Sequence, residues 1–221
     1  DAGLPSLGRL SAESVRFRRA YTQGTRTAVA IGALMLGTYS AHIDWRQMIY
    51  RGGRLQDPAA MSEAQIKALK GKFVYTTVPA KDGPEMLAER LHAKGLHTMV
   101  TAYAGDNEFF QKGGSYDRGW DAFEDMTEQK WQAPTSAKVG DVAEKQRAGA
   151  GDKRWFQWIH FYDPHESNGT RPKYETMVRA FDEALGHLID DLKARGQWDN
   201  TIVVLVADHG EALGDHGHKG H

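Results

Sequence analysis

Two polar residues at the end of an apolar run have the side-chain types that bind metal ions. Asp208 and His209 directly follow the stretch Thr201–Ala207, so an oxygen and a nitrogen ligand would emerge together from the end of an expected strand. Such a pair suits zinc or manganese. The alternative is that Asp208 caps the following turn while His209 is solvated.

Histidines occur at two further places where chemistry is plausible. His165 lies in a proline-stiffened turn at residues 163–165, just past a second strand-like run. A turn histidine of this kind is more often a surface residue than a catalytic one. The glycine-rich tail holds His216, His218 and His221, whose ring nitrogens bind ligands or donate protons. For His216 and His218 a flexible loop without function is the favoured alternative.

Thr27 is a candidate nucleophile. It begins the apolar stretch Thr27–Leu36, which is predicted to be a buried helix ended by Gly37. A threonine at a helix start is usually an N-cap. The same position, however, places its hydroxyl beside free helix N–H groups, where a phosphoryl group is stabilised. Thr25 is a rival for either role, and the spacing alone does not choose between the two threonines.

Alternating helix and strand patterns predict how these residues are positioned. The clearest helix has apolar residues at three-and-four spacing from Tyr174 to Leu192 and ends at Gly196. The β-branched run Thr201–Ala207 predicts a central parallel strand buried on both faces. Loops that leave the carboxyl ends of parallel strands converge, so the candidate residues are expected to meet at one crevice. We also expect helices at 4–14, from 62 and at 84–94, strands at 72–77, 97–103 and 155–161, and a surface excursion at 111–152.

Length and composition exclude several classes of protein. With 221 residues, 40% of them hydrophobic, the chain can bury the core of one compact α/β domain. Lys plus Arg number 28 against 29 Asp plus Glu, which argues against a nucleic-acid partner. The absence of cysteine excludes a disulfide scaffold and a cysteine nucleophile. No long apolar run or secretory leader pattern occurs, so we expect this stretch to be soluble.

Several motifs, in the same order along the chain, resemble sulfatase-like proteins of the alkaline phosphatase superfamily. They include Leu4-Pro5-Ser6-Leu7-Gly8-Arg9-Leu10, Tyr116-Asp117-Arg118-Gly119-Trp120-Asp121, Trp158-Ile159-His160-Phe161-Tyr162-Asp163-Pro164-His165 and Ala207-Asp208-His209-Gly210-Glu211. Shorter matches lie at 13–17, 20–22, 95–98, 199–201 and 214–217. The resemblance covers nearly the whole chain. It implies an alkaline-phosphatase-like α/β/α sandwich with a mainly parallel central sheet.

The resemblance also selects the nucleophile. Alignment with threonine-nucleophile relatives and with phosphoethanolamine transferases places the attacking threonine at Thr27 rather than Thr25, although Val29 and Ala30 replace the usual proline and serine. Sulfatases convert a cysteine or serine at this position to formylglycine, and this chain has a threonine there. The implied function is therefore a metal-dependent hydrolase or transferase that cleaves a phosphate ester, phosphodiester or phosphonate through a phosphothreonine intermediate. The alternatives are an ordinary sulfatase and a non-catalytic sulfatase-like binding domain.

The family pattern assigns further roles. Asp208 and His209, with Thr27, would hold one or two divalent ions, which would be zinc, manganese or calcium. His165 and His221 would bind substrate oxygens or protonate the leaving group, and so would be catalytic together with Thr27. The substrate would be an anionic ester of a small molecule, lipid or glycan. The location would be extracytoplasmic, either periplasmic or membrane-anchored, with any membrane tether outside this segment.

The resemblance implies that residues 1–221 are a single catalytic domain from a larger protein. The family takes its first metal carboxylate from a strand upstream of Leu4, and relatives continue beyond His221. A lysine-tryptophan-histidine segment that follows the Gly95 motif in the family is replaced by residues 102–105. We therefore expect a fragment that lacks the first metal-binding strand and the C-terminal part, and whose metal shell is incomplete.

Overall fold

The computed structural model describes residues 3–51, 54–69, 74–103, 114–126, 135–167 and 169–220. Its helices are α1 (Pro5–Ala12), α2 (Thr27–Leu36), α3 (Glu63–Ala68), α4 (Leu87–Ala93), α5 (Ser136–Ala150) and α6 (Arg171–Ala194). Its strands are β1 (Trp45–Arg51), β2 (Arg54–Gln56), β3 (Val74–Pro79), β4 (His97–Ala102), β5 (Ala122–Asp125), β6 (Trp155–Ile159), β7 (Ala212–Leu213) and β8 (Lys219–Gly220). Short 3₁₀ helices lie between several of these elements.

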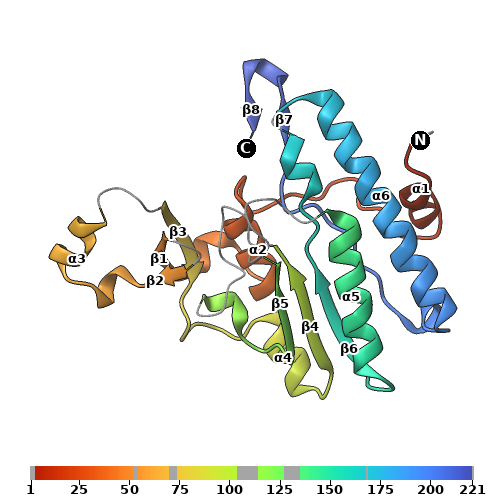
Figure 1. The fold of residues 1–221 in the computed structure, drawn as a ribbon, viewed down its shortest axis with the longest axis horizontal. Helices are drawn as coiled ribbons and strands as arrows, with labels where there is room; N and C mark the ends of the chain where they lie inside the picture. Colours follow the sequence, from red (N-terminus) through yellow and green to blue (C-terminus); the bar gives the residue numbers. More distant parts are fainter. Residues whose placement is uncertain are drawn as a thin grey trace.

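A parallel sheet with strand order β5-β4-β6 forms the centre of the fold (Figure 1). The helix α5 packs on β4 and β6, and the hydroxyl of Thr101 in β4 donates to Gln146 of α5 at 2.6 Å. The neighbouring residues Val100 and Ala102 belong instead to an apolar cluster that includes α2. Because successive strand residues point to opposite faces, helices cover both faces of this sheet. The predicted α/β class with a parallel sheet between helices is confirmed.

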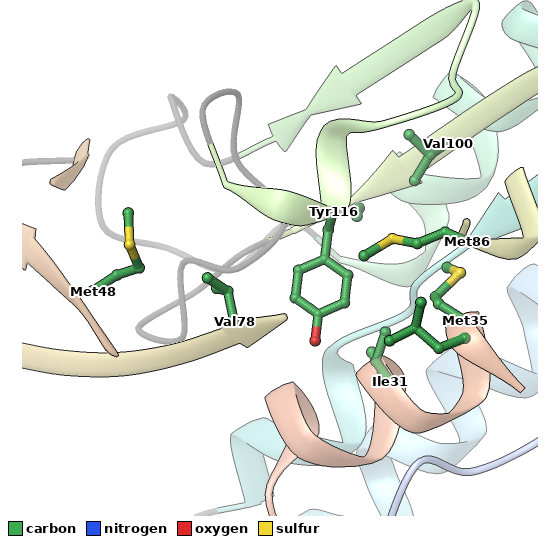
Figure 2. Close-up of a cluster of buried hydrophobic side chains, with 9 residues drawn as sticks. Ile31, Met35, Met48, Val78, Met86, Val100 and Tyr116 are labelled. Atoms are coloured by element: carbon green, nitrogen blue, oxygen red, sulfur yellow. The ribbon is translucent and has the colours of Figure 1, made fainter. Parts of the chain in front are cut away.

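The helix α2, which begins at Thr27, is fixed by a buried cluster on one face of the sheet (Figure 2). Ile31 and Met35 of α2 pack there beside Tyr116, which is 1% exposed. The Tyr116 hydroxyl donates to the Ala28 carbonyl oxygen at 2.6 Å, and burial raises the pKa of this phenol. A Cβ at Gly32 would lie 2.7 Å from Tyr116 Oη, so the close approach of the tyrosine requires glycine. The first turn of α2 is therefore held in one place.

The long helix α6 confirms the predicted helix over residues 174–192 and carries α1 on its surface (Figure 1). Leu10 of α1 packs against Ile189 of α6. Asp182, which is 2% exposed, accepts hydrogen bonds from the backbone N–H groups of Ser6 at 3.0 Å and Leu7 at 2.7 Å. This carboxylate satisfies donors at the start of α1 that the helix leaves without partners. None of the described helices, α6 included, is long and apolar enough to cross a membrane.

A second, antiparallel sheet has the order β2-β1-β3. It contains the strand predicted at residues 72–77, which the structure places at Val74–Pro79, residues 72 and 73 lying outside the described residues. The predicted helix from Ser62 is α3, with Ser62 and Gln65 forming a capping box. The predicted helix at 84–94 is shorter and begins at Leu87.

The prediction of a surface excursion at residues 111–152 is wrong. Within the described part of this segment, β5 joins the central sheet and α5 extends over fifteen residues. Val139 and Ala143 of α5 are fully buried. Glycine and charged residues made the segment look like a loop, but a helix needs only one apolar stripe to pack on a sheet. Residues 104–113 and 127–134 lie outside the described residues.

The prediction that Thr201–Ala207 is a buried central strand is also wrong for the described structure. No strand pairs with this segment among the described residues, and Ile202 and Val204 are 93% and 80% exposed. A β-branched run favours an extended backbone, but burial requires neighbouring strands, and the described parallel sheet ends at β6. The predicted burial of α2 on all sides likewise fails at Leu34, which is 43% exposed.

Candidate active site

Thr27 and His209 meet although 182 positions separate them in the sequence. Thr27 Oγ1 lies 2.9 Å from His209 Nε2. The threonine is the first residue of α2 and is 6% exposed. The side chain of His209, which follows the extended segment 201–207, is 9% exposed. The start of α2 and the Asp208-His209 pair therefore form one largely buried contact.

The structure excludes the alternative that Thr27 is an ordinary helix cap. Arg26 occupies the N-cap position with an extended backbone and makes no side-chain capping bond. The Thr27 hydroxyl is one residue further along and faces His209. Thr25 is exposed, and the described residues offer its side chain no hydrogen bond. Of the two rival threonines, only Thr27 lies against the Asp208-His209 pair.

The hydrogen bond made by Nδ1 of His209 determines the protonation of Nε2, the nitrogen that faces Thr27. Nδ1 lies 2.8 Å from the Gly210 carbonyl oxygen. A carbonyl oxygen only accepts hydrogen bonds, so Nδ1 carries a proton and donates it to this bond. In the neutral ring Nε2 is then unprotonated, and its lone pair faces the Thr27 hydroxyl. An imidazole nitrogen in this state accepts a proton from an alcohol or binds a metal ion.

The Asp208 carboxylate has an oxygen that suits a cation. Asp208 Oδ2 is buried with no hydrogen-bond donor in the described part of the chain, and it lies 3.4 Å from His209 Nε2. The lone pairs of Asp208 Oδ2 and His209 Nε2 repel each other at this distance. A positive charge between them, either a proton on Nε2 or a metal ion, removes this repulsion. Asp208 and His209 therefore fit a divalent cation as part of its ligand shell. Within the described ranges, no three His, Asp or Glu side chains gather into a complete set.

His160 is a site residue that the sequence reasoning passed over. It directly follows β6, and removal of its ring from water is the main cause that lowers its pKa. The charge of Asp208 opposes this shift, whereas His209 and His165 add to it. These interactions show that His160 lies near His165 and near the Asp208-His209 pair. Its position at the carboxyl end of a predicted strand was the signal that could have identified it.

His165 is presented by a rigid turn. It lies in the 3₁₀ helix Asp163–Ser167, its N–H donates to the Tyr162 carbonyl oxygen at 2.9 Å, and its ring packs on that of Tyr162 with centroids 4.5 Å apart. Asp163 is 5% exposed and accepts a hydrogen bond at 2.8 Å from the backbone N–H of Ser136, the first residue of α5. The aspartate of this motif is thus a structural anchor, and the motif holds His165 firmly near His160.

The histidines of the tail do not join this contact in the described structure. His216 and His218 are exposed in the turn between β7 and β8, and neither hydrogen-bonds Thr27 or Asp208 among the described residues. His216 has a φ of 52°, a left-handed conformation that is uncommon outside glycine. His221, predicted to bind substrate or protonate the leaving group, lies outside the described residues.

Comparison with known proteins agrees with the motifs and with the fold. The family model described as Sulfatase matches residues 2–221. A multifunctional alkaline phosphatase superfamily protein, PehA of Trinickia caryophylli, is 39% identical over 54 residues, which is 24% of this chain and 10% of that protein. An uncharacterized sulfatase of Escherichia coli K12, YdeN, is 20% identical, and the match covers 95% of this chain and 43% of that protein.

A solved structure shows the same fold. The crystal structure of an alkaline phosphatase superfamily protein from Vibrio parahaemolyticus matches with a TM-score of 0.52 and 20% identity, over 90% of this chain and 47% of that one. The chain thus spans less than half the length of each of these three proteins. Since the family model covers almost every residue, the chain belongs to the sulfatase family of the alkaline phosphatase superfamily.

Proposed function

We propose that this chain is part of a metal-dependent hydrolase or transferase that cleaves a phosphate ester, phosphodiester or phosphonate ester through a phosphothreonine intermediate on Thr27. The observation that carries the proposal is the 2.9 Å contact between Thr27 Oγ1 and His209 Nε2 at the start of a buried helix. Membership of the sulfatase family supports an enzyme that acts on anionic esters. Asp208 Oδ2, which is buried and meets no donor in the described part of the chain, supports a metal ion beside Thr27.

Each residue of the site has a role in this reaction. Asp208 and His209 would hold a divalent ion, which when bound acts as a Lewis acid and favours the ionised form of a neighbouring alcohol. Thr27 Oγ loses its proton to solvent and forms a bond to phosphorus as the bond from phosphorus to the leaving-group oxygen breaks. His165, and His221 by family resemblance, bind the substrate oxygens or give the departing oxygen a proton. Water or an acceptor alcohol then attacks phosphorus and frees Thr27.

The first turn of α2 supports the same assignment. A helix N-terminus attracts anions through its free N–H groups and its dipole, and the cap residue Arg26 leaves that end without a side-chain acceptor. Val29 and Ala30, which replace the family's usual proline and serine, are accounted for by packing, since Ala30 is 6% exposed and Val29 lies against Gly24. The replacement of proline and serine is therefore compatible with the contact between Thr27 and His209.

A sulfuric ester hydrolase is the second candidate, because the matching family model is described as Sulfatase. Formylglycine chemistry requires an oxidised cysteine or serine, and this chain has no cysteine and carries threonine at position 27. Expression in a host that forms formylglycine, followed by mass analysis of the Thr27 peptide, separates the two candidates. We expect an unmodified threonine.

The test of the proposal compares Thr27→Ala with Thr25→Ala in the full-length protein. With zinc or manganese added, the wild type is expected to hydrolyse an aryl phosphodiester. Loss of a nucleophile commonly lowers kcat by about 10³-fold or more, so Thr27→Ala should be essentially inactive while the exposed Thr25→Ala keeps full activity. Attack on a diester releases one aryl oxide, so acid quenching during turnover should leave a phosphoryl group that still carries the second ester substituent on the Thr27 peptide. Full activity of Thr27→Ala would remove the proposed nucleophile.

The proposal also covers the location of the enzyme and the class of its substrate. We propose an extracytoplasmic enzyme, and a substrate that is an anionic ester of a small molecule, a lipid or a glycan. The near-balance of 28 basic and 29 acidic residues supports a small anionic group rather than a nucleic acid as the partner.

A further inference from the structure

The hydroxyl of Thr22 connects the loop in front of α2 to the segment that carries Asp208. Thr22 Oγ1 lies 2.5 Å from the Asp208 carbonyl oxygen and 2.9 Å from the Gly24 carbonyl oxygen. A hydroxyl has one proton to donate, so the nearer acceptor, Asp208, receives the main hydrogen bond. The Gly24 N–H donates in return to Thr22 Oγ1 at 3.4 Å.

Two contacts thus join the same two segments at the site. The first runs from Thr22 to the backbone of Asp208, and the second runs from Thr27 Oγ1 to His209 Nε2 at 2.9 Å. The loop between Thr22 and Thr27 packs closely on α2, because a Cβ on Gly24 would lie 2.8 Å from Val29 Cγ1. A change at the Thr22 hydrogen bond would therefore act on the same two segments that carry Thr27 and the Asp208-His209 pair.

We propose that Thr22 is a positioning residue, whose hydroxyl sets the place of Thr27 Oγ relative to Asp208 and His209 without touching the substrate. Its effect on turnover rests on the proposed function, whereas its effect on the geometry of the site does not. Misplacement of a reacting group by about 1 Å can cost about 100-fold in rate. Thr22 is exposed, so its substitution disturbs no core packing and the effect can be separated from folding.

The experiment uses Thr22→Val, which removes the hydroxyl and keeps the shape, and Thr22→Ser, which restores the donor. Thr25→Val is the matched control, since Thr25 is exposed on the same loop and its side chain has no hydrogen bond among the described residues. One measurement is kcat and KM on an aryl phosphodiester with zinc. The other is amide hydrogen exchange of residues 22–28 and 208–210 without substrate, followed by mass spectrometry.

The expected result for Thr22→Val is a kcat lowered about tenfold with little change in KM, together with faster exchange in both segments. Thr22→Ser should restore both values, and Thr25→Val should match the wild type. Unchanged exchange in Thr22→Val overturns the inference, and so does faster exchange with unchanged kcat. If turnover proves independent of Thr27, the proposed function is wrong, but the role of Thr22 can still be tested. Faster hydrogen exchange in Thr22→Val that Thr22→Ser reverses would then support the positioning role, and unchanged exchange would overturn it.

Discussion

The position of a single ring proton determines the chemistry of His209. Because Nδ1 donates to the Gly210 carbonyl oxygen at 2.8 Å, the nitrogen that faces Thr27 carries the lone pair of the neutral ring, which accepts a proton or binds a metal ion. Asp208 Oδ2, which is buried and meets no donor among the described residues, lies 3.4 Å from the same nitrogen. The backbone carbonyl of the next residue in the same motif thus orients the imidazole, as outer-shell contacts commonly do at metal sites.

Asp208 and His209, the proposed metal ligands, can be tested by substitution. If they hold the metal, Asp208→Asn and His209→Ala should each lower the zinc or manganese bound by the protein, because the first replaces a carboxylate oxygen and its charge and the second removes the ring nitrogen. Loss of even an outer-shell contact weakens metal affinity roughly 10- to 100-fold, and loss of a direct ligand should cost at least as much. Elemental analysis after dialysis measures the bound metal.

His218→Ala is the matched control for this prediction, since His218 is an exposed histidine that lies shortly after His209 in the chain. It should keep the wild-type metal content. Unchanged metal stoichiometry in both the Asp208 and His209 variants would contradict their role as ligands.

Among the elements, α2 is the part whose placement matters most for the site. The Tyr116 hydroxyl donates to Ala28 in the first turn of this helix at 2.6 Å, and the indole N–H of Trp120 donates to the Tyr116 carbonyl oxygen at 2.8 Å. The motif at residues 116–121 is therefore a structural support for the first turn of α2. Gly119 in this motif has a φ of 78°, and a Cβ there would lie 2.4 Å from the Glu89 backbone nitrogen.

Loss of the hydrogen bond from Tyr116 to α2 should destabilise the protein. Tyr116→Phe is expected to lower the free energy of unfolding by about 1 kcal/mol, the usual net value of one buried hydrogen bond. For a chain of this size that corresponds to a fall in Tm of about 2–4 °C. Tyr39→Phe is the control, because Tyr39 is 64% exposed. Urea unfolding of both variants measures the difference. Equal stability of Tyr116→Phe and the wild type would show that the bond to Ala28 contributes nothing.

At the scale of the whole molecule, a polar cluster around Asp121 lies at the amino end of the parallel sheet. Asp121 Oδ2 accepts the Thr98 N–H at 2.8 Å and lies 3.2 Å and 3.3 Å from Nδ1 of His92 and His97. The hydrogen bond from the Thr98 backbone is the largest cause that holds the pKa of Asp121 below its ordinary value, with further contributions from the Thr98 side chain and His92. This cluster links α4, β4 and the start of β5.

The lowered pKa of Asp121 predicts a pH dependence of stability. A carboxyl whose pKa is lower in the folded state stabilises the fold above its unfolded pKa of about 4, and this contribution is lost as the pH falls through the folded pKa. The stability lost in Asp121→Asn should therefore be full at pH 6 and should shrink below pH 4. Urea midpoints of both proteins between pH 6 and pH 3 measure it. A difference that stays constant with pH would argue against this contribution of Asp121.

The sequence by itself determined the local elements and the identities of several candidate residues. The helices at 27–36 and 171–194 and the strands at 97–102 and 155–159 follow from apolar spacing and from glycine stops, which act over a few residues. The position of Asp208 and His209 after an extended apolar run could also be predicted. These features depend on neighbours in the chain. Composition conceals them where a helix is weakly amphipathic, as in α5, or where a strand is short, as in β5.

Only the tertiary structure decided which residues meet. It brought Thr27 to His209 and gave Thr22 a bond to Asp208, because these contacts join segments more than a hundred positions apart that no local pattern records. It also brought His160 close enough to Asp208 and His209 for their charges to affect its pKa. It also left Ile202 and Val204 exposed, since membership of a sheet depends on partner strands and not on propensity. Local patterns reflect the conformations that a segment favours by itself, whereas the chemistry of this site arises from the packing of distant segments.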